Sequence, residues 1–473
     1  MKNKKFYINT IGCQMNVYDS EQIAERLQRI GFVAGTMVEE VDLVIVNTCS
    51  IREKAEQKAF SFLGRLAKMK RERPRLMVGV CGCVAQQEGH KIVERMPHVD
   101  FVLGTQAIER LPAAIERIER QRCRIVDVNM AQEIQETAEI PSSAKPHEIS
   151  RFVTIMRGCD NYCTYCVVPY VRGRETSREP ENIISEIKSL VANGVREITL
   201  LGQNVNSYGK KQGLCDFPTL LKRINDVAGL LRLRFTTSHP KDLSDGLIAA
   251  FRSMEKLCHH IHLPVQSGSN DVLERMNRRY TREKYLEMVA NLREACPEIA
   301  ITSDIIVGFP GETREDFEQT KALIRQVEFD SLFAFIYSDR PNVPSGRFKG
   351  KVKENEKKQR LQEVFDLQTG ITQKIHACMK GTIQEVLVEG TSKKQAAENQ
   401  GRAMDAVQWT GRTSGNKIVN FIQNHVSHVD TGIQAGEMVQ VRIEKTFPHS
   451  LWGSLITCDP GHSLAKGDES YAA

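Results

Sequence analysis

Gly158-Cys159-Asp160-Asn161-Tyr162-Cys163-Thr164-Tyr165-Cys166 is the stretch that gives the rest of the chain its meaning. It holds three cysteines at a C-x₃-C-x₂-C spacing, and the next cysteine along the chain is Cys215. Three thiolates this close together hold three corners of a metal cluster and leave one corner open for a substrate or cofactor. The spacing therefore indicates a catalytic metal centre rather than a closed structural one.

Working outward, the composition is that of a globular protein of about three domains, with 473 residues, 41% hydrophobic and 26% charged. The net charge of +6 permits a nucleic-acid partner without requiring one. The N-terminal MKNKKFYINT lacks the apolar run of a secretory signal, and no apolar segment is long enough to span a membrane. Thirteen cysteines, an odd number, point to free thiols in a reducing compartment. We therefore expect a cytoplasmic protein without a membrane partner.

Residues 5–125 alternate strand and helix patterns. Strands are expected at Lys5–Asn9, Asp42–Val46, Leu76–Val80 and Phe101–Leu103, and helices at Asp19–Ile30, Glu53–Lys70 and Ile108–Arg120. This βαβα order predicts an α/β domain with a doubly wound parallel sheet.

Cysteines follow the first three of these strands: Cys13, then Cys49, then Cys81 and Cys83. The carboxyl ends of parallel strands share one edge, which is the edge where open α/β sheets bind ligands. Buried cysteines that only pack are common, but cysteines at three equivalent strand ends predict a second metal site. Spacing alone does not choose between Cys81 and Cys83.

Residues 126–148 are polar and contain Pro141 and Pro146, so they are expected to form a linker. Residues 149–377 then carry six strand patterns with helical patterns between them. The expected strands are Arg151–Arg157, Glu197–Leu201, Leu233–Thr237, His260–Val265, Ile299–Val307 and Leu332–Tyr337. This order predicts a partial (β/α)₆ barrel whose chemistry lies in the loops after the strands.

Residues 378–446 change character. Thr382–Glu389 alternates apolar and polar side chains, and Lys417–Phe421 and Met438–Lys445 read as further short strands. With glycines between them, they predict a small antiparallel β-barrel. Residues 447–473 are expected to be a tail.

Iron–sulfur chemistry explains the cysteine loop better than zinc, because a zinc site needs a second ligand pair at a recognisable spacing. A four-iron cluster takes one thiolate per iron, so Cys159, Cys163 and Cys166 leave one iron free.

The loop, with Tyr165 just before its last cysteine, resembles the radical S-adenosylmethionine (SAM) superfamily. In that superfamily the free iron binds the amino and carboxylate groups of SAM, and one electron cleaves SAM to a 5′-deoxyadenosyl radical. The resemblance implies that residues at later strand ends bind SAM. These are Gly202, Gln203 and Asn204 for the methionyl part, and Ser238, Gln266, Ser267, Asp304 and Ile306 for the ribose and adenine.

The order of the three domains resembles the methylthiotransferase family over about residues 5–446. The motifs Gly12–Asn16, Asn47–Glu53 and Cys163–Tyr170 resemble its MiaB branch. That branch adds a methylthio group to carbon 2 of N6-isopentenyl (dimethylallyl) adenosine beside the anticodon of tRNA. The last domain, with Gly411-Arg412-Thr413, resembles the RNA-binding TRAM module. The resemblance implies an auxiliary 4Fe-4S cluster on Cys13, Cys49 and Cys83.

A methylthio transfer of this kind also implies two molecules of SAM per product, a sulfur donor and an electron donor, and we expect a monomer. For tRNA phosphates, candidate cations are the Arg65–Arg75 run and Arg151, Arg157, Arg172, Arg174 and Arg178. Three alternatives stay open at this point: a sister branch that modifies an aspartate of a ribosomal protein, another that uses threonylcarbamoyl-adenosine, and an iron–sulfur RNA-binding protein without catalysis.

Overall fold

The computed structural model describes residues 4–50, 53–130, 148–392, 407–422 and 432–456. The chain divides into two compact units, Met1–Gln368 and Thr369–Ala473. Most of the expected linker and most of the expected tail lie outside the described residues. Among the helices that are described, none is long and apolar enough to cross a membrane.

A six-stranded parallel sheet begins the first unit, in the order β2-β1-β3-β4-β5-β6. Its strands are β1 (Lys5–Ile11), β2 (Val33–Ala34), β3 (Leu43–Thr48), β4 (Met77–Gly82), β5 (Phe101–Leu103) and β6 (Ile125–Asp127). Strands β3 and β4 are buried along their whole length, which is why Leu43–Val46 of β3 and most of β4 read as apolar runs. The predicted doubly wound sheet is confirmed, although its two short edge strands, β2 and β6, were not predicted.

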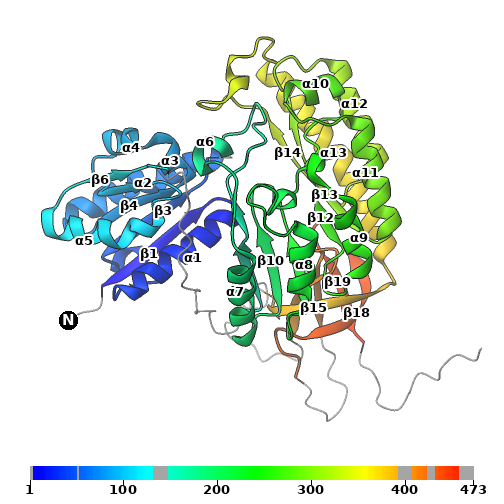
Figure 1. Ribbon diagram of the computed structural model, residues 1–473, viewed down its shortest axis with the longest axis horizontal. Coiled ribbons are helices and arrows are strands. Elements are labelled where there is room, and N and C mark those ends of the chain that lie inside the picture. Colours follow the sequence, from blue (N-terminus) through cyan, green and yellow to red (C-terminus); the bar gives the residue numbers. More distant parts are fainter. Residues whose placement is uncertain (1–3, 51–52, 131–147, 393–406, 423–431, 457–473) are drawn as a thin grey trace, which may run out of the picture. The chain divides into compact units, whose positions relative to one another are not determined.

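Helices cover both faces of this sheet (Figure 1). They are α1 (Gln14–Arg29), α2 (Glu53–Glu72), α3 (Cys83–Glu88), α4 (His90–Arg95) and α5 (Leu111–Gln121), with short 3₁₀ turns η1 (Val38–Glu40) and η2 (Ile108–Arg110). Helix α1 begins earlier than predicted because Cys13 is its N-cap and Asn16 accepts a hydrogen bond from the Cys13 N–H. A cysteine at this position gives no ordinary start signal.

Six parallel strands follow in sequence order, as two three-stranded sheets, and confirm the predicted (β/α)₆ barrel. They are β7 (Ser150–Thr154), β10 (Glu197–Leu201), β11 (Arg232–Phe235), β12 (His260–His262), β13 (Ala300–Val307) and β14 (Ser331–Ile336). A parallel bridge between Leu233 and Leu257 and a hydrogen bond from the Ser238 N–H to the His262 carbonyl join the two sheets.

Helices alternate with these strands (Figure 1). They are α6 (Val168–Arg172), α7 (Pro180–Ala192), α8 (Phe217–Asn225), α9 (Asp245–Ser253), α10 (Asn270–Arg275), α11 (Arg282–Ala295), α12 (Arg314–Val327) and α13 (Glu354–Met379), with turns η3 (Val205–Ser207), η4 (Pro240–Asp242) and η5 (Pro344–Arg347) and a two-stranded ribbon of β8 (Met156–Arg157) and β9 (Thr176–Ser177). Side-chain N-caps at Asp216, Ser244, Thr281 and Thr313 set where α8, α9, α11 and α12 begin.

The second unit contains a closed barrel of five strands in the order β15-β16-β17-β19-β18. They are β15 (Ile383–Thr391), β16 (Gln408–Thr413), β17 (Ile418–Ile422), β18 (Met438–Thr446) and β19 (Leu451–Leu455). Two details of the prediction are wrong. Strand β19 lies inside the stretch expected to be a tail, because Gly453 and Ser454 weaken its strand pattern. Strands β17 and β19 also pair in parallel, whereas the other pairs are antiparallel.

Candidate functional site

The cysteine loop runs from the end of β8 to the start of α6 and is held at both sides by backbone contacts. Gly158 has φ +75°, and a Cβ there would lie 2.0 Å from the Arg174 carbonyl oxygen, so only glycine fits. The Thr164 N–H donates to the Met276 carbonyl at 3.1 Å, and the Asn277 side chain donates to the Tyr162 carbonyl at 3.0 Å. The end of α10, a helix that was not predicted, thus positions the loop.

The three cysteines of the loop lie close enough for their charges to interact. Burial raises the pKa of Cys159 to about 11 and that of Cys166 to about 12. Arg278 Nη1 lies 3.5 Å from Cys163 Sγ, and His239 Nε2 lies 3.9 Å from the same sulfur. Thiols buried this deeply are poor nucleophiles but become thiolates when a metal ion binds them.

No three His, Cys, Asp or Glu side chains of the described chain converge as the ligands of one metal ion do. A four-iron cluster makes no such demand, because each thiolate binds a different iron. The donor set of three thiols within one loop fits that cluster.

Two polar side chains at the strand ends fit a polar ligand. Gln203 accepts a hydrogen bond from the Gly158 N–H through Oε1, and its Nε2 is buried without a partner among the described residues. Ser238 Oγ, after β11, is likewise buried and unpartnered there. Each such group costs about 1–3 kcal/mol if left unsatisfied, so both mark places where a bound molecule such as SAM would complete the hydrogen bonding.

Three of the other predicted SAM contacts have structural roles of their own. Asn204 bridges the Asp242 carboxylate and the His239 N–H, and Ser267 is fully buried beside Thr320, so both hold loops in place. Gly202 has no room for a side chain, because a Cβ would lie 2.5 Å from Met156.

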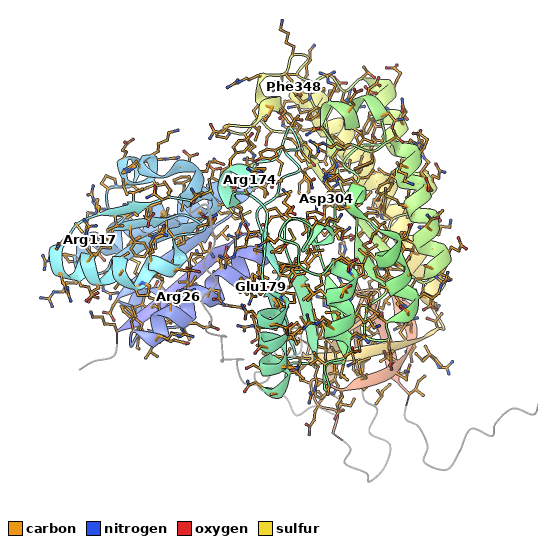
Figure 2. All side chains as sticks on the ribbon, viewed as in Figure 1. Arg26, Arg117, Arg174, Glu179, Asp304 and Phe348 are labelled. Atoms are coloured by element: carbon orange, nitrogen blue, oxygen red, sulfur yellow. The ribbon has the colours of Figure 1, made fainter. Side chains whose placement is uncertain are left out.

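The remaining candidates are Gln266 after β12, Asp304 and Ile306 within β13, and Tyr165 in the cysteine loop. Gln266 has φ +73° and forms a parallel β-bridge with Ile305. The carboxylate oxygen Oδ2 of Asp304 lies 3.5 Å from His262 Nε2. Figure 2 labels Asp304 on the barrel and Arg174 just after α6. Ile306 and Tyr165 share one apolar cluster with Phe309 and Tyr337, which connects β13 to the cysteine loop.

In the first domain, Cys13 interacts with both Cys49 and Cys83. A hydrogen bond with Cys49, helped by the charge of Arg172, lowers the pKa of Cys13 to about 6. Burial raises the pKa of Cys83, which interacts with both Cys13 and Arg172. Cys81 does not follow β4 as predicted but lies within it, buried in the core under α1 and α5. Cys83 is the first residue of α3 and packs instead against Val167 and Val171 of the cysteine-loop segment.

An amide network that was not predicted from the sequence ties the strand ends together. Asn16 Nδ2 donates to Asn47 Oδ1 and to the Thr48 carbonyl, and Asn47 Nδ2 donates to the Asn16 carbonyl and to Ser20 Oγ. Both asparagines are fully buried. Asn16 lies in the motif Gly12–Asn16, and Asn47 lies in the motif Asn47–Glu53. The sequence therefore drew attention to both residues, but it did not show that their side chains hydrogen bond to each other.

Most of the arginines expected to contact tRNA are used inside the protein. Arg151 pairs with Glu148 at 2.6 Å, Arg178 with Glu186 at 2.8 Å, and Arg172 with Asp19 at 2.6 Å. Their expected role as phosphate contacts is therefore wrong, because buried partners already hold their charges. Arg174 differs, with 81% of its side chain exposed.

In the Arg65–Arg75 run, Lys70 pairs with Asp100 at 2.7 Å, and Arg73 donates to the Glu39 and Val41 carbonyls. These two side chains stabilise the fold, whereas Arg65 stays exposed.

Family models match three parts of the chain. The Radical SAM superfamily matches residues 153–324, the uncharacterized protein family UPF0004 matches residues 5–104, and the TRAM domain matches residues 378–456. Together with the parallel barrel and its three-cysteine loop, these matches define a radical SAM enzyme.

Curated relatives match along nearly the whole chain and carry one name, tRNA-2-methylthio-N(6)-dimethylallyladenosine synthase. The protein from Desulfosudis oleivorans is 54% identical over 99% of this chain and 100% of its own. The protein from Syntrophus aciditrophicus is 48% identical over 98% of this chain and 97% of its own. The chain belongs to the family of tRNA-2-methylthio-N(6)-dimethylallyladenosine synthases. It is a radical SAM transferase whose cofactors are SAM and two 4Fe-4S clusters.

Solved structures agree with the fold. The radical S-adenosylmethionine methyltransferase TsrM from Kitasatospora setae, with cobalamin and a 4Fe-4S cluster bound, has a TM-score of 0.54 at 15% identity. The match covers 73% of this chain and 74% of that one. At this identity the similarity concerns the fold alone.

Proposed function

We propose that this protein replaces the hydrogen on carbon 2 of N6-isopentenyl (dimethylallyl) adenosine in tRNA with a methylthio group. Cys159, Cys163 and Cys166 hold the cluster that binds SAM, and Cys13, Cys49 and Cys83 hold the auxiliary cluster. The observation that carries this proposal is that two groups of cysteines from separate parts of the sequence interact within each group, and that α6, which follows Cys166, packs against Cys83. Cys81 takes no part, because its side chain is buried in the core between the sheet and helices α1 and α5, whereas Cys83 packs against the cysteine-loop segment.

The bound cofactors supply the radical that attacks an unactivated aromatic C–H bond and the sulfur that replaces its hydrogen. The chain supplies position. Gln203 Nε2 and Ser238 Oγ, which lack partners among the described residues, would donate to polar atoms of SAM, and Asp304 and Ile306 of β13 would hold its nucleoside part. Arg278 and His239 place their nitrogens against Cys163 and fix its sulfur.

Further parts of the proposal follow from the reaction. An electron donor and a sulfur donor are required, and the protein works in the cytoplasm, where tRNA is found. Independently of the reaction, we keep the expectation that it is a monomer. The domains are the auxiliary-cluster domain (5–125), a linker (126–148), the radical SAM core (149–377) and the TRAM domain, which we extend from 378–446 to include β19.

Iron analysis tests the two-cluster assignment. Three thiolates hold each four-iron cluster, so anaerobically reconstituted protein is expected to carry about eight irons per chain. Replacing the three loop cysteines together is expected to halve this value, and so is replacing Cys13, Cys49 and Cys83 together. A zinc-only preparation, or a loss of all iron from either variant, would contradict the assignment.

A basic groove on the first sheet offers a place for the tRNA backbone. Its volume is about 600 Å³, and it lies between the end of β1 and the side of α2 that carries Lys54, Lys58 and Arg65. The cations Lys54, Lys58 and Arg65 line it without any carboxylate among the lining residues. The Arg65 guanidinium lies 5.2 Å from the centre of the Phe62 ring. Because β1 leads directly to Cys13, phosphates bound in this groove would lie toward the strand end that carries this proposed ligand of the auxiliary cluster.

Salt-dependent binding tests the groove. Lys58→Gln with Arg65→Gln is expected to weaken tRNA binding on the order of tenfold at low salt and to flatten the dependence of log K on log salt by about two phosphate contacts. The measurement is fluorescence anisotropy with labelled tRNA across a salt series. Lys68→Gln is the matched control, because Lys68 lies on the same helix outside the groove and faces Glu72. Equal losses in both proteins would refute the groove.

A further inference from the structure

Arg172 is a buried cation whose position the reaction does not explain by itself. It ends α6 and is 5% exposed. Its Nη2 lies 2.6 Å from Asp19 Oδ2, and its Nη1 lies 3.5 Å from Asp19 Oδ1. Asp19 belongs to α1 and is itself 2% exposed. Buried ion pairs cost more desolvation than they return unless further groups use the charge.

Sulfur atoms are those further groups. The charge of the guanidinium acts on the thiols of Cys83 and Cys13, and Val171, the residue before Arg172, packs against Cys83. The cation therefore lies between one carboxylate and two of the three thiols proposed to hold the auxiliary cluster.

Helix α6 links the cysteine loop that is proposed to hold the SAM cluster to Arg172, its last residue. The helix begins two residues after Cys166, and Val171 packs against Cys83. The Thr105 hydroxyl donates to the Val171 carbonyl at 2.6 Å and fixes the helix on the first sheet. One five-residue helix thus connects the SAM-cluster loop to the auxiliary thiols.

We propose that Arg172 is a positioning residue that sets the reduction potential of the auxiliary cluster, by holding a buried positive charge beside the thiols of Cys83 and Cys13. Asp19 orients the guanidinium and offsets part of its charge. This inference rests on the proposed cluster ligands. Net charge and hydrogen bonds to sulfur are the main protein controls on cluster potential.

The two partners have opposite expected effects. A reduced cluster carries one more negative charge, so a nearby cation favours reduction and a nearby anion opposes it. Arg172→Gln is therefore expected to make the midpoint potential more negative, and Asp19→Asn to make it more positive. A purely structural ion pair predicts no such opposition, because either substitution breaks the same contact.

The test uses full-length protein with Cys159, Cys163 and Cys166 replaced by alanine, so that only the auxiliary cluster remains. Its midpoint potential is measured by redox titration followed by electron paramagnetic resonance. We expect Arg172→Gln to lower the equilibrium constant for one-electron reduction at least tenfold, which corresponds to about 59 mV. Arg172→Lys keeps the charge and is expected to retain most of the potential. Arg174→Gln, two residues along and exposed, is the control and is expected to change nothing.

Two further measurements distinguish a failure of this inference from a folding defect and from a wrong ligand assignment. They use the double variant of Asp19 and Arg172 and the parent alanine protein. Asp19→Asn with Arg172→Gln leaves no unpaired buried charge, and its potential is expected below that of the parent because the cation lies on the sulfur side of the pair. Shifts of the same sign in the two single variants, or an unchanged potential in the double variant, would overturn the role of Arg172. Loss of iron from the parent alanine protein itself would overturn the ligand assignment instead, and this inference with it.

Discussion

Cys159→Ala is expected to abolish the reductive cleavage of SAM. Removing one of three thiolates leaves two irons of the cluster without protein ligands, so no single open corner is defined. The loop offers no replacement, since Cys159 lies between Gly158, which tolerates no side chain, and the exposed turn at Tyr162. The measurement is the amount of 5′-deoxyadenosine formed from SAM under a strong reductant, and we expect the background level.

Cys215→Ala is the matched control for that experiment. Cys215 is the next cysteine in the chain, partly buried just before α8, and Arg223 is its hydrogen-bond partner. It is expected to keep the activity of the parent protein. Continued SAM cleavage by Cys159→Ala, or equal loss in both variants, would show that the loop cysteines do not hold the SAM cluster.

Cys49→Ala is expected to separate the two halves of the reaction. SAM cleavage continues, because Cys49 lies after β3 in the first sheet and the SAM-binding loop lies in the barrel. Methylthio transfer is lost, because the auxiliary cluster loses one of its three ligands. The measurement compares 5′-deoxyadenosine with methylthiolated nucleoside from the same reaction.

Cys81→Ala serves as the control for Cys49→Ala. Cys81 is fully buried within β4 and faces the core with Phe101 and Leu103 rather than the strand ends. Its substitution costs some stability through lost packing, and methylthio transfer is expected to remain. If Cys49→Ala still makes product while Cys81→Ala does not, the auxiliary ligand set is wrong.

The architecture was predictable because its signals are local. Apolar runs such as Leu43–Val46 mark buried parallel strands. Parallel strand ends share an edge, so the strand pattern alone was enough to predict that Cys13, Cys49 and a cysteine after the third strand meet. Short strands were not predicted, because so few residues give too weak a local signal. Strand β2 has two residues and β19 contains a glycine, so neither carries enough periodicity to be noticed.

The surroundings of the cysteines were not predictable from spacing. Arg278 reaches Cys163 from 115 residues away, and Arg172 reaches Asp19 from 153 residues away. A basic residue near a cluster motif looks the same in sequence whether it is exposed like Arg174 or buried like Arg172. Only the packing of α6 on the first sheet distinguishes them. For this reason the expected phosphate contacts were partly wrong, while the expected metal ligands stay a prediction.

Mass spectrometry of tRNA nucleosides tests the central claim most directly. Reconstituted protein is incubated with SAM, a reductant, a sulfide source and tRNA that carries N6-isopentenyl adenosine without the methylthio group. We predict that this nucleoside, and no other, gains one methylthio group at carbon 2. An unchanged nucleoside, with the methylthio group found instead on threonylcarbamoyl-adenosine or on an aspartate of a ribosomal protein supplied in parallel, would contradict the account.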